Sequence, residues 1–238
     1  MATVSVVWSA PTASPTLVHL LDEAEQARLE RLRNAGDRDR FVAAHALLRI
    51  MVGRQLGCAP ERVVLNSTCP RCGGPHGPPR LVDRAGRQVL HLSLAHAGSR
   101  VLAAVSTAGP VGVDVDVDAA AAFRGFDAVA LAATERSMIA RLPPSDRPAA
   151  RVTAWVRKEA VLKATRDGLN VPPGDVVVSP LGEPPRLLAW DDAPPDPVHM
   201  HDVDVAARGH AACVAVVSAL RPEFLVCRGE ALLGGVAG

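Results

Sequence analysis

The stretch Trp155-Val156-Arg157-Lys158-Glu159-Ala160-Val161-Leu162-Lys163 has a weaker copy earlier in the same chain. A shift of 114 residues overlays it on Phe41-Val42-Ala43-Ala44-His45-Ala46-Leu47-Leu48-Arg49. A shift of 112 residues aligns residues 213–218 with residues 101–106, and both segments are apolar and end in Ser. Each copy reads as a long helix, a short strand, a loop and an apolar strand. Such self-similarity indicates an α+β chain of two similar halves, although any two amphipathic helices align to some degree.

The boundary between the halves falls at Thr107-Ala108-Gly109-Pro110, where Gly and Pro interrupt the pattern. We therefore divide the chain into residues 1–108 and 109–238. Two packed halves leave a cleft between them, and such interfaces are frequent ligand sites.

Apolar periodicity and turn residues locate the elements within each half. Helices are expected over residues 22–33, 37–56, 126–141 and 146–166. Strands are expected over residues 89–95, 101–106 and 111–117, with short strands near Val176, Leu187, Val203 and Val214. Residues 69–79 form a Gly- and Pro-rich loop, and residues 191–197 form a second polar loop. The tail after Arg228 is expected to fray.

Composition narrows the class of protein. The 238 residues are 48% hydrophobic with a net charge of +1, so no global attraction to nucleic acid or membrane is expected. No apolar run is long enough for a membrane span, and residues 1–10 lack the charged start of a secretory signal. Five cysteines without regular spacing favour a reduced, cytoplasmic setting.

The segment 111–118 alternates strictly between small apolar residues and aspartates. Successive side chains of a strand point to opposite faces, so Asp114, Asp116 and Asp118 share one face. Carboxylates at this spacing repel one another unless a cation lies between them, and Mg²⁺ prefers such oxygen ligands. An edge strand with a solvated acidic face explains the pattern equally well.

Lys158 and Lys163 are the only lysines of the sequence. Glu159 and Lys163 are four residues apart and share a helix face, whereas Lys158 points away from it. The pair could be a surface ion pair, but Trp155 and Leu162 flank the same face and indicate partial burial. A Glu beside an acidic strand, with a Lys next to it, suits a metal-bound diphosphate.

These motifs resemble those of the 4′-phosphopantetheinyl transferases of the surfactin-synthetase-activating type. The signature of that family is G-[IV]-D-[IV]-[ED] followed some 40 residues later by W-x-x-K-E-[AS]-x-x-K, and residues 112–116 and 155–163 match it. The resemblance continues at residues 39–49, 77–79, 94–98 and 167–169. It implies a pseudo-twofold α+β fold, each half a small antiparallel sheet packed on a long helix.

The resemblance also implies an activity. The enzyme would transfer the 4′-phosphopantetheine arm of coenzyme A to a serine of an apo acyl or peptidyl carrier protein, releasing 3′,5′-ADP. Asp114, Asp116 and Glu159 would hold Mg²⁺, with Mn²⁺ as the alternative ion. Glu159 would also be the base, and Lys163 would contact the diphosphate. Further CoA ligands would be Arg40 and His96 at the 3′-phosphate, with Arg28, Arg80 and Lys158 as helpers. The first half would then hold the 3′-phosphate and the second half the metal.

The chain departs from the family pattern at Pro78, where the family has Lys, at Ala95, where it has Ser, and at Asp116, where Glu is commoner. Arg80 could replace the lost lysine contact. The size of the chain favours, by analogy, a monomer that acts on several carriers; fatty-acid, polyketide and nonribosomal-peptide carriers all stay open.

Two other functions compete with the transferase. The same carboxylates could serve an Mg²⁺-dependent phosphohydrolase or nuclease, although 3% aromatic residues and a net charge of +1 speak against a nucleic-acid groove. Cys69, Cys72 and His76 could form a zinc loop of a non-catalytic binding module. Only three ligands lie close together there, and a reduced loop explains them as well.

Overall fold

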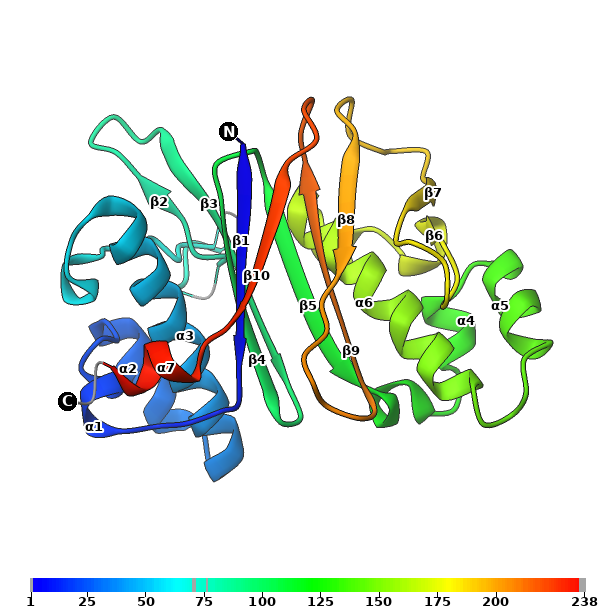
Figure 1. Cartoon of the computed structure of the whole chain (residues 1–238), viewed down its shortest axis with the longest axis horizontal. Coiled ribbons are helices and arrows are strands. Elements are labelled where there is room, and N and C mark those ends of the chain that lie inside the picture. Colours follow the sequence, from blue (N-terminus) through cyan, green and yellow to red (C-terminus); the bar gives the residue numbers. More distant parts are fainter. Residues whose placement is uncertain (1, 70–71, 76, 236–238) are drawn as a thin grey trace.

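The fold is mixed α+β, as predicted. The computed structural model describes residues 2–69, 72–75 and 77–235. Two sheets lie at the centre, with one long helix on each outer side (Figure 1). The larger helices are α2 (Glu23–Arg31), α3 (Ala35–Leu56), α5 (Ala133–Ala140) and α6 (Arg147–Thr165), and the shorter ones are α1 (Pro15–Val18), α4 (Phe126–Ala130) and α7 (Glu230–Gly234).

The first sheet has five strands in the order β10-β1-β4-β3-β2, and the second has three in the order β5-β9-β8. The strands of the first sheet are β1 (Thr3–Ser9), β2 (Leu81–Val82), β3 (Gln88–Ala97), β4 (Arg100–Ser106) and β10 (Glu223–Arg228). Those of the second are β5 (Val111–Val117), β8 (Val198–Asp202) and β9 (His210–Val217), while β6 (Val177–Val178) and β7 (Leu187–Ala189) form a separate pair.

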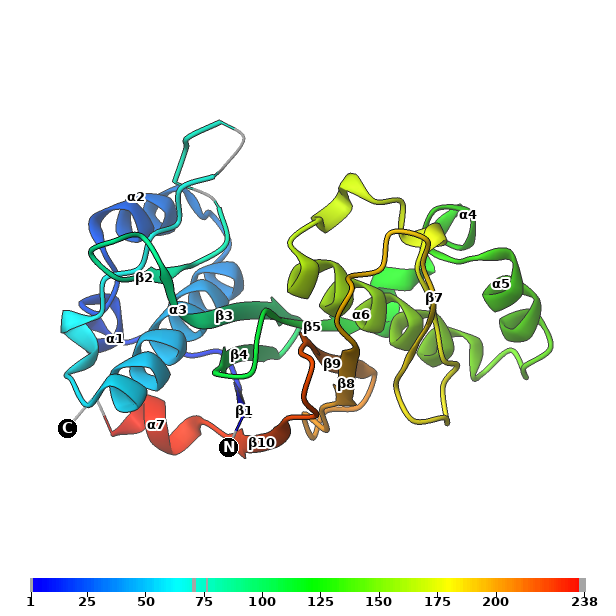
Figure 2. The ribbon, with the colours of Figure 1, turned by 90° about the horizontal axis from the view of Figure 1, so that it is seen from above.

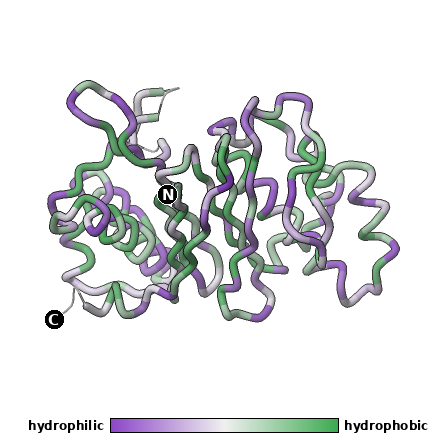
Figure 3. The backbone as a smooth tube through the Cα atoms, turned by 45° about the horizontal axis from the view of Figure 1, so that its top comes forward, coloured by the Kyte–Doolittle hydropathy of each residue, from purple (hydrophilic) through white to green (hydrophobic). Residues whose placement is uncertain are grey.

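Apolar side chains hold the two sheets face to face. Val4 and Val6 of β1 meet Val113 and Val115 of β5 in one buried cluster, together with Val214 of β9. A second cluster lies between the first sheet and α3, and a third between the second sheet and α6. The order of layers is therefore helix, sheet, sheet, helix, which Figure 2 shows from above. In Figure 3 the hydrophobic segments follow the central strands, and polar segments lie in the outer loops.

Local sequence explains where the two long helices begin and end. Asn34 caps α3 by accepting a hydrogen bond from the Asp37 N–H at 3.2 Å, and Gly57 ends it in the left-handed conformation at φ 65°. Pro148 lies in the first turn of α6, where its missing N–H costs nothing. Arg166 ends α6 with the same left-handed φ, 67°, although it is not a glycine.

Three strands (β1, β2 and β10) and two short helices (α1 and α7) were absent from the sequence-based assignment. β1 was not expected, and β10 pairs with it in parallel from the far end of the chain. The first sheet is therefore neither wholly antiparallel nor built from residues 1–108 alone. The tail after Arg228 was expected to fray, but α7 forms there because Leu233 is buried in the cluster beneath α3. The division of the chain at residue 108 and the pseudo-twofold relation stay predictions.

The expected helix over residues 126–141 is two helices, α4 and α5. The chain breaks at Leu131-Ala132, where the Ala132 N–H donates to the Glu135 carboxylate at 2.8 Å. Glu135 thereby caps the start of α5, which favours a new helix over continuation of the old one. The strand expected near Val203 lies slightly earlier, as β8, and the residues aligned with β6 in the first half, Val63 and Val64, form no strand.

Candidate functional site

The candidate site forms where β5 packs on α6 at unusually short range. A methyl group at Gly112 would lie 2.1 Å from the Ala160 carbonyl oxygen and 2.5 Å from the Ala164 nitrogen. Only glycine allows this approach. The strand continues as Asp114 and Asp116 on the face toward the helix, while Val113 and Val115 face the other sheet. The alternation predicted from the sequence is confirmed for residues 111–117, whereas Asp118 lies beyond the strand and begins a 3₁₀ helix.

Lys163 is the positive centre of this site. Its ammonium donates to Asp114 Oδ1 at 2.6 Å and to the Val113 carbonyl at 3.1 Å. Burial raises the pKa of Asp114 above its usual value, against the lowering effect of Lys163, and the charge of Asp116 raises it further. Asp116 is only partly buried and accepts a hydrogen bond from the Val117 N–H at 2.8 Å.

Glu159 completes a group of three carboxylates around Lys163. Burial raises the pKa of Glu159, the charges of Asp114 and Asp116 raise it further, and Lys163 opposes them. Its Oε1 is buried without a hydrogen-bond partner among the described residues. An orphaned carboxylate oxygen beside two aspartates is a donor set that a hard divalent cation would satisfy.

The described residues contain no group of three side chains arranged to hold a metal ion as they stand. The reason lies in the contacts already made, because Lys163 occupies Asp114 and a backbone N–H occupies Asp116. The residue types and the orphaned Glu159 oxygen fit Mg²⁺, which keeps several water and phosphate ligands and needs few from protein. Binding would require the carboxylates to turn from their present partners.

Lys158 does not belong to this site, which corrects its assignment as a CoA ligand. Its side chain is fully buried on the other side of α6. The ammonium donates to Glu135 Oε2 and to the carbonyls of Ala130 and Pro173, at 2.8 and 3.0 Å for the carbonyls. All three hydrogens are used, so none is left for a ligand. Lys158 instead connects α6 to the start of α5.

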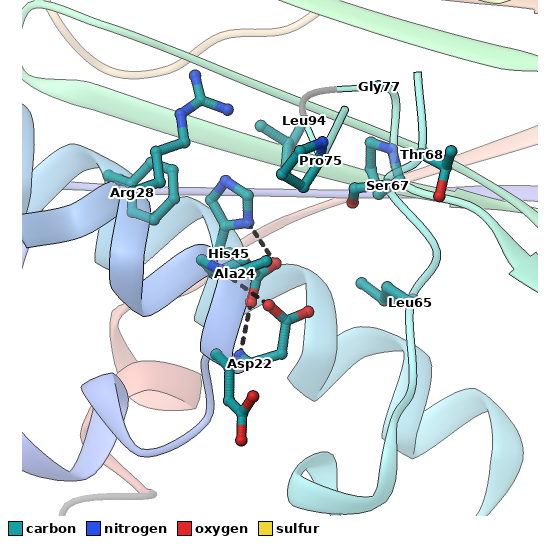
Figure 4. A pocket seen from close by; sticks show the side chains of 14 residues that line it. Asp22, Ala24, Arg28, His45, Leu65, Ser67, Thr68, Pro75, Gly77 and Leu94 are labelled. Carbon is teal, nitrogen blue, oxygen red and sulfur yellow. Dashed lines mark hydrogen bonds and ion pairs between the residues drawn. The ribbon is translucent and has the colours of Figure 1, made fainter. Parts of the chain in front are cut away.

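A cavity of about 530 Å³ lies at the first half of the molecule, between α2, α3 and the loop that contains Ser67 and Pro75. Figure 4 shows Arg28 and His45 on one side of this cavity, facing Pro75 and Ser67. His45 Nδ1 lies 2.7 Å from Glu25 Oε1. Because Glu25 is ionised, Nδ1 carries a proton, and the other ring nitrogen has no hydrogen-bond partner among the described residues.

Glu25 stays charged despite its burial. Desolvation alone would raise its pKa, but the hydrogen bond and charge of His45, with the charge of Arg49, outweigh this effect and lower the pKa to about 2. Arg49 Nη2 contacts Glu25 Oε2 at 2.6 Å and Asp22 Oδ2 at 2.8 Å. This network fixes the wall from which His45 projects.

Arg40 and His96 lie close to the same wall. Arg40 donates to the Gly98 carbonyl at 2.9 Å and pairs with Asp37. Desolvation lowers the pKa of His96, and the charges of His45, Arg40, Lys163 and Arg28 lower it further. The His96 side chain is exposed, so solvent screens these charges. An imidazole surrounded by cationic side chains indicates a region in which an anion would bind favourably.

A second cavity, of about 500 Å³, links this wall to Lys163. Arg28, Gly77, Pro79 and Leu94 line both cavities, and Lys163 lines the second. The structure thus brings Arg28 and Lys163 along one hollow, whereas Arg40 and His96 lie near it but line neither cavity. Pro78, which stands where the family has Lys, also lines the second cavity and offers no charge there.

Arg80 does not line either of these cavities. It lies at a third one, with His91 and Arg166, and therefore does not replace the lysine absent at position 78. The zinc hypothesis stays open, because His76 lies outside the described residues.

Sequence reasoning missed His45 and Glu25 as members of the site. The internal repeat could have indicated His45, because the shift of 114 residues aligns His45 with Glu159 and Arg49 with Lys163. Both aligned positions are thus polar in each copy, although the rest of the helix face is apolar. Polar residues on an apolar face indicate buried groups with a specific hydrogen-bonding role.

The comparisons with known proteins point to one superfamily. Residues 110–215, which contain β5, α6 and β9, match the model of the 4′-phosphopantetheinyl transferase superfamily. The match covers less than half of the 238 residues. None of the described helices could cross a membrane.

Two relatives were found over 173 residues each. A Synechocystis sp. protein, named provisionally as a 4′-phosphopantetheinyl transferase, is 33% identical over 69% of this chain and 65% of its own length. The 4′-phosphopantetheinyl transferase HetI of Nostoc sp. is 28% identical over 68% of this chain and 69% of its own. The chain therefore spans just under two thirds of the first relative.

Proposed function

We propose that the protein transfers 4′-phosphopantetheine from coenzyme A to a serine of an apo carrier protein, with Mg²⁺ as the required ion. One observation carries the proposal: Lys163, which lies among three carboxylates, lines one end of a hollow whose other end is lined by Arg28 and His45. CoA has the matching distribution of charge, with a diphosphate at a distance from the 3′-phosphate. The superfamily match over residues 110–215 supports the same activity.

Each group has a part in the proposed reaction. Arg28, Arg40 and His96 would bind the 3′-phosphate. His45 would join them as an imidazolium, with Nδ1–H donating to Glu25 and Nε2–H donating to a phosphate oxygen. Lys163 would leave Asp114 for the diphosphate. The bound Mg²⁺ would neutralise the phosphates and act as a Lewis acid. Asp114, Asp116 and Glu159 would supply its protein ligands.

The chemical step is a displacement at the phosphorus that carries the pantetheine arm. The serine oxygen forms the new P–O bond, and the diphosphate P–O bond breaks to release 3′,5′-ADP. Glu159 takes the proton of the serine hydroxyl, directly or through water. Lys163 stabilises the charge that develops on the leaving phosphate.

The test is incubation with CoA, Mg²⁺ and apo carriers of the fatty-acid, polyketide and nonribosomal-peptide classes, followed by mass spectrometry of each carrier. We expect a phosphopantetheine adduct on at least one carrier and none without the metal. A folded protein that modifies no carrier, yet releases phosphate or nucleotide from CoA, would show a phosphohydrolase instead. The panel also names the carrier class.

A further inference from the structure

A third hollow lies where the two halves meet behind the Lys163 cavity. It measures about 370 Å³. Arg80, Gln88 and His91 contribute from the β2–β3 side, and Arg166, Asp167 and Asp192 contribute from the second half. The proposed transferase reaction gives this hollow no part, because the phosphates of CoA are accounted for by Lys163 and by the cluster around Arg28.

The cationic groups of this hollow have few partners. Arg80 Nε and His91 Nδ1 are buried and make no hydrogen bond to any residue in the described part of the chain. Arg166 donates to the Gln88 side-chain oxygen at 3.2 Å. Within the described ranges, neither Asp167 nor Asp192 forms an ion pair with either arginine.

The same groups repel one another. Partial desolvation lowers the pKa of Arg166, and the charge of Arg80 lowers it further. Desolvation also lowers the pKa of His91, with a second contribution from Arg166. Asp167 and Asp192 line the hollow but pair with neither arginine in the described part of the chain, so an anion between the cationic groups would relieve their repulsion.

The backbone holds Arg166 at the hollow in spite of an unfavourable conformation. Its φ of 67° is one that residues other than glycine and asparagine seldom adopt. Its N–H donates to the Lys163 carbonyl at 3.3 Å, which ends α6 directly behind the lysine of the candidate site. Such strain persists where the surrounding structure requires it and is frequent at binding sites.

We propose that Arg80, His91 and Arg166 form a second anion site, which binds a small tetrahedral oxyanion such as orthophosphate or sulfate. The planar donors of the two arginines suit phosphate oxygens, and the unpartnered nitrogens of Arg80 and His91 supply two donors when His91 carries its proton on Nδ1. His91 and Arg166 also line the Lys163 cavity, so an anion here lies next to the proposed diphosphate position. This inference does not depend on the transferase activity.

The experiment is titration of the purified full chain with orthophosphate and, separately, with sulfate. Binding is followed by calorimetry and by the ring signals of His91, which are assigned from their loss in a His91→Gln variant. We expect saturable binding in the millimolar range that shifts these signals. Arg80→Gln and Arg166→Gln should each weaken it about tenfold, because each removes charge-assisted hydrogen bonds. Arg80→Lys should recover part of the loss.

Two further variants separate the possible positions of the anion. Arg87→Gln is the matched control, because Arg87 lies on the same hairpin but is exposed and paired with Asp83. Arg28→Gln reports on the cavity assigned to CoA. Binding that survives both substitutions supports the proposal. An absence of saturable binding, a loss as large in Arg87→Gln as in Arg80→Gln, or a loss confined to Arg28→Gln would overturn it. Circular dichroism of each variant shows that the comparison is between folded proteins.

Discussion

The two lysines of the chain offer the sharpest test of how the site is built, because they lie on one helix and have opposite environments. Lys158 is fully buried and paired with Glu135, whose side chain is 4% exposed. Lys163 is one-third exposed and contacts Asp114. We expect Lys158→Ala to reduce stability and Lys163→Ala to reduce the rate of transfer.

The stability effect follows from the charge left behind. Removing one partner of a buried ion pair costs about 3–5 kcal/mol. In a chain of this size each kcal/mol lowers the melting temperature by roughly 2–4 °C, so Lys158→Ala should melt about 6–20 °C earlier. Lys158→Met with Glu135→Gln should recover part of this loss, because the pair is then removed together. The Ala132 and Val178 N–H groups still need an acceptor at position 135, so recovery stays incomplete.

The rate effect follows from the transition state. A single donor to a developing charge is worth about 2.7–4 kcal/mol, so Lys163→Ala should lower kcat by about 10²–10³. Its stability should change by about 1 kcal/mol or less, as for a partly exposed pair. Carrier modification and thermal melting measure the two effects, with rates normalised to folded protein. Equal losses of activity in the two variants would refute the assignment of the helix faces.

Three other changes test the surrounding structure. Gly112→Ala should cost at least about 1–3 kcal/mol of stability and most of the activity, because the new methyl group meets the Ala160 carbonyl. Denaturant titration and the transfer assay measure the two effects. A variant as stable and as active as the parent would contradict the packing of β5 on α6. Glu159→Gln should abolish transfer yet stabilise the metal-free protein at neutral pH. The folded-state pKa of Glu159 is raised, so the charge of Glu159 reduces stability as the pH rises through this pKa. Melting temperatures with and without Mg²⁺, at acidic and at neutral pH, show whether the variant is stabilised as expected. Glu25→Gln should lower the free energy of unfolding by up to about 3 kcal/mol at neutral pH. The lowered pKa of Glu25 gives the parent stability that disappears as the pH falls from 4.5 to about 2. A variant whose stability falls in acid as steeply as the parent's would exclude this role.

Local periodicity was sufficient for the parts of the site that lie within one element. The alternation of residues 111–118 placed Asp114 and Asp116 on one face, and the spacing of Glu159 and Lys163 placed these on one turn of helix. Each prediction needed only the geometry of a strand or a helix. The close approach of β5 to α6, which unites the two pairs, depends on Gly112 and was not foreseen.

Local sequence patterns could not predict contacts between segments that are distant in the chain. β1 and β10 are more than 200 residues apart, and neither carries a turn signal that names the other as its partner. Lys158 was misassigned for the same reason. Its position 100° from Glu159 was read correctly, but its burial depends on where α5 and the 3₁₀ turn at Pro173–Asp175 pack, and nothing local to α6 encodes that placement.

The internal repeat relates residues of the candidate site as well as elements of the fold. Positions 45 and 49 in α3 and positions 159 and 163 in α6 are related by the same shift. In α3 these positions carry His45 and Arg49, which hold a buried glutamate beside the Arg28 cavity. In α6 they carry Glu159 and Lys163 beside two aspartates. If both helices present the same turn to the interior, the related position carries a histidine in the first half and a glutamate in the second. Exchanging His45 for Glu should then weaken CoA binding without displacing the metal.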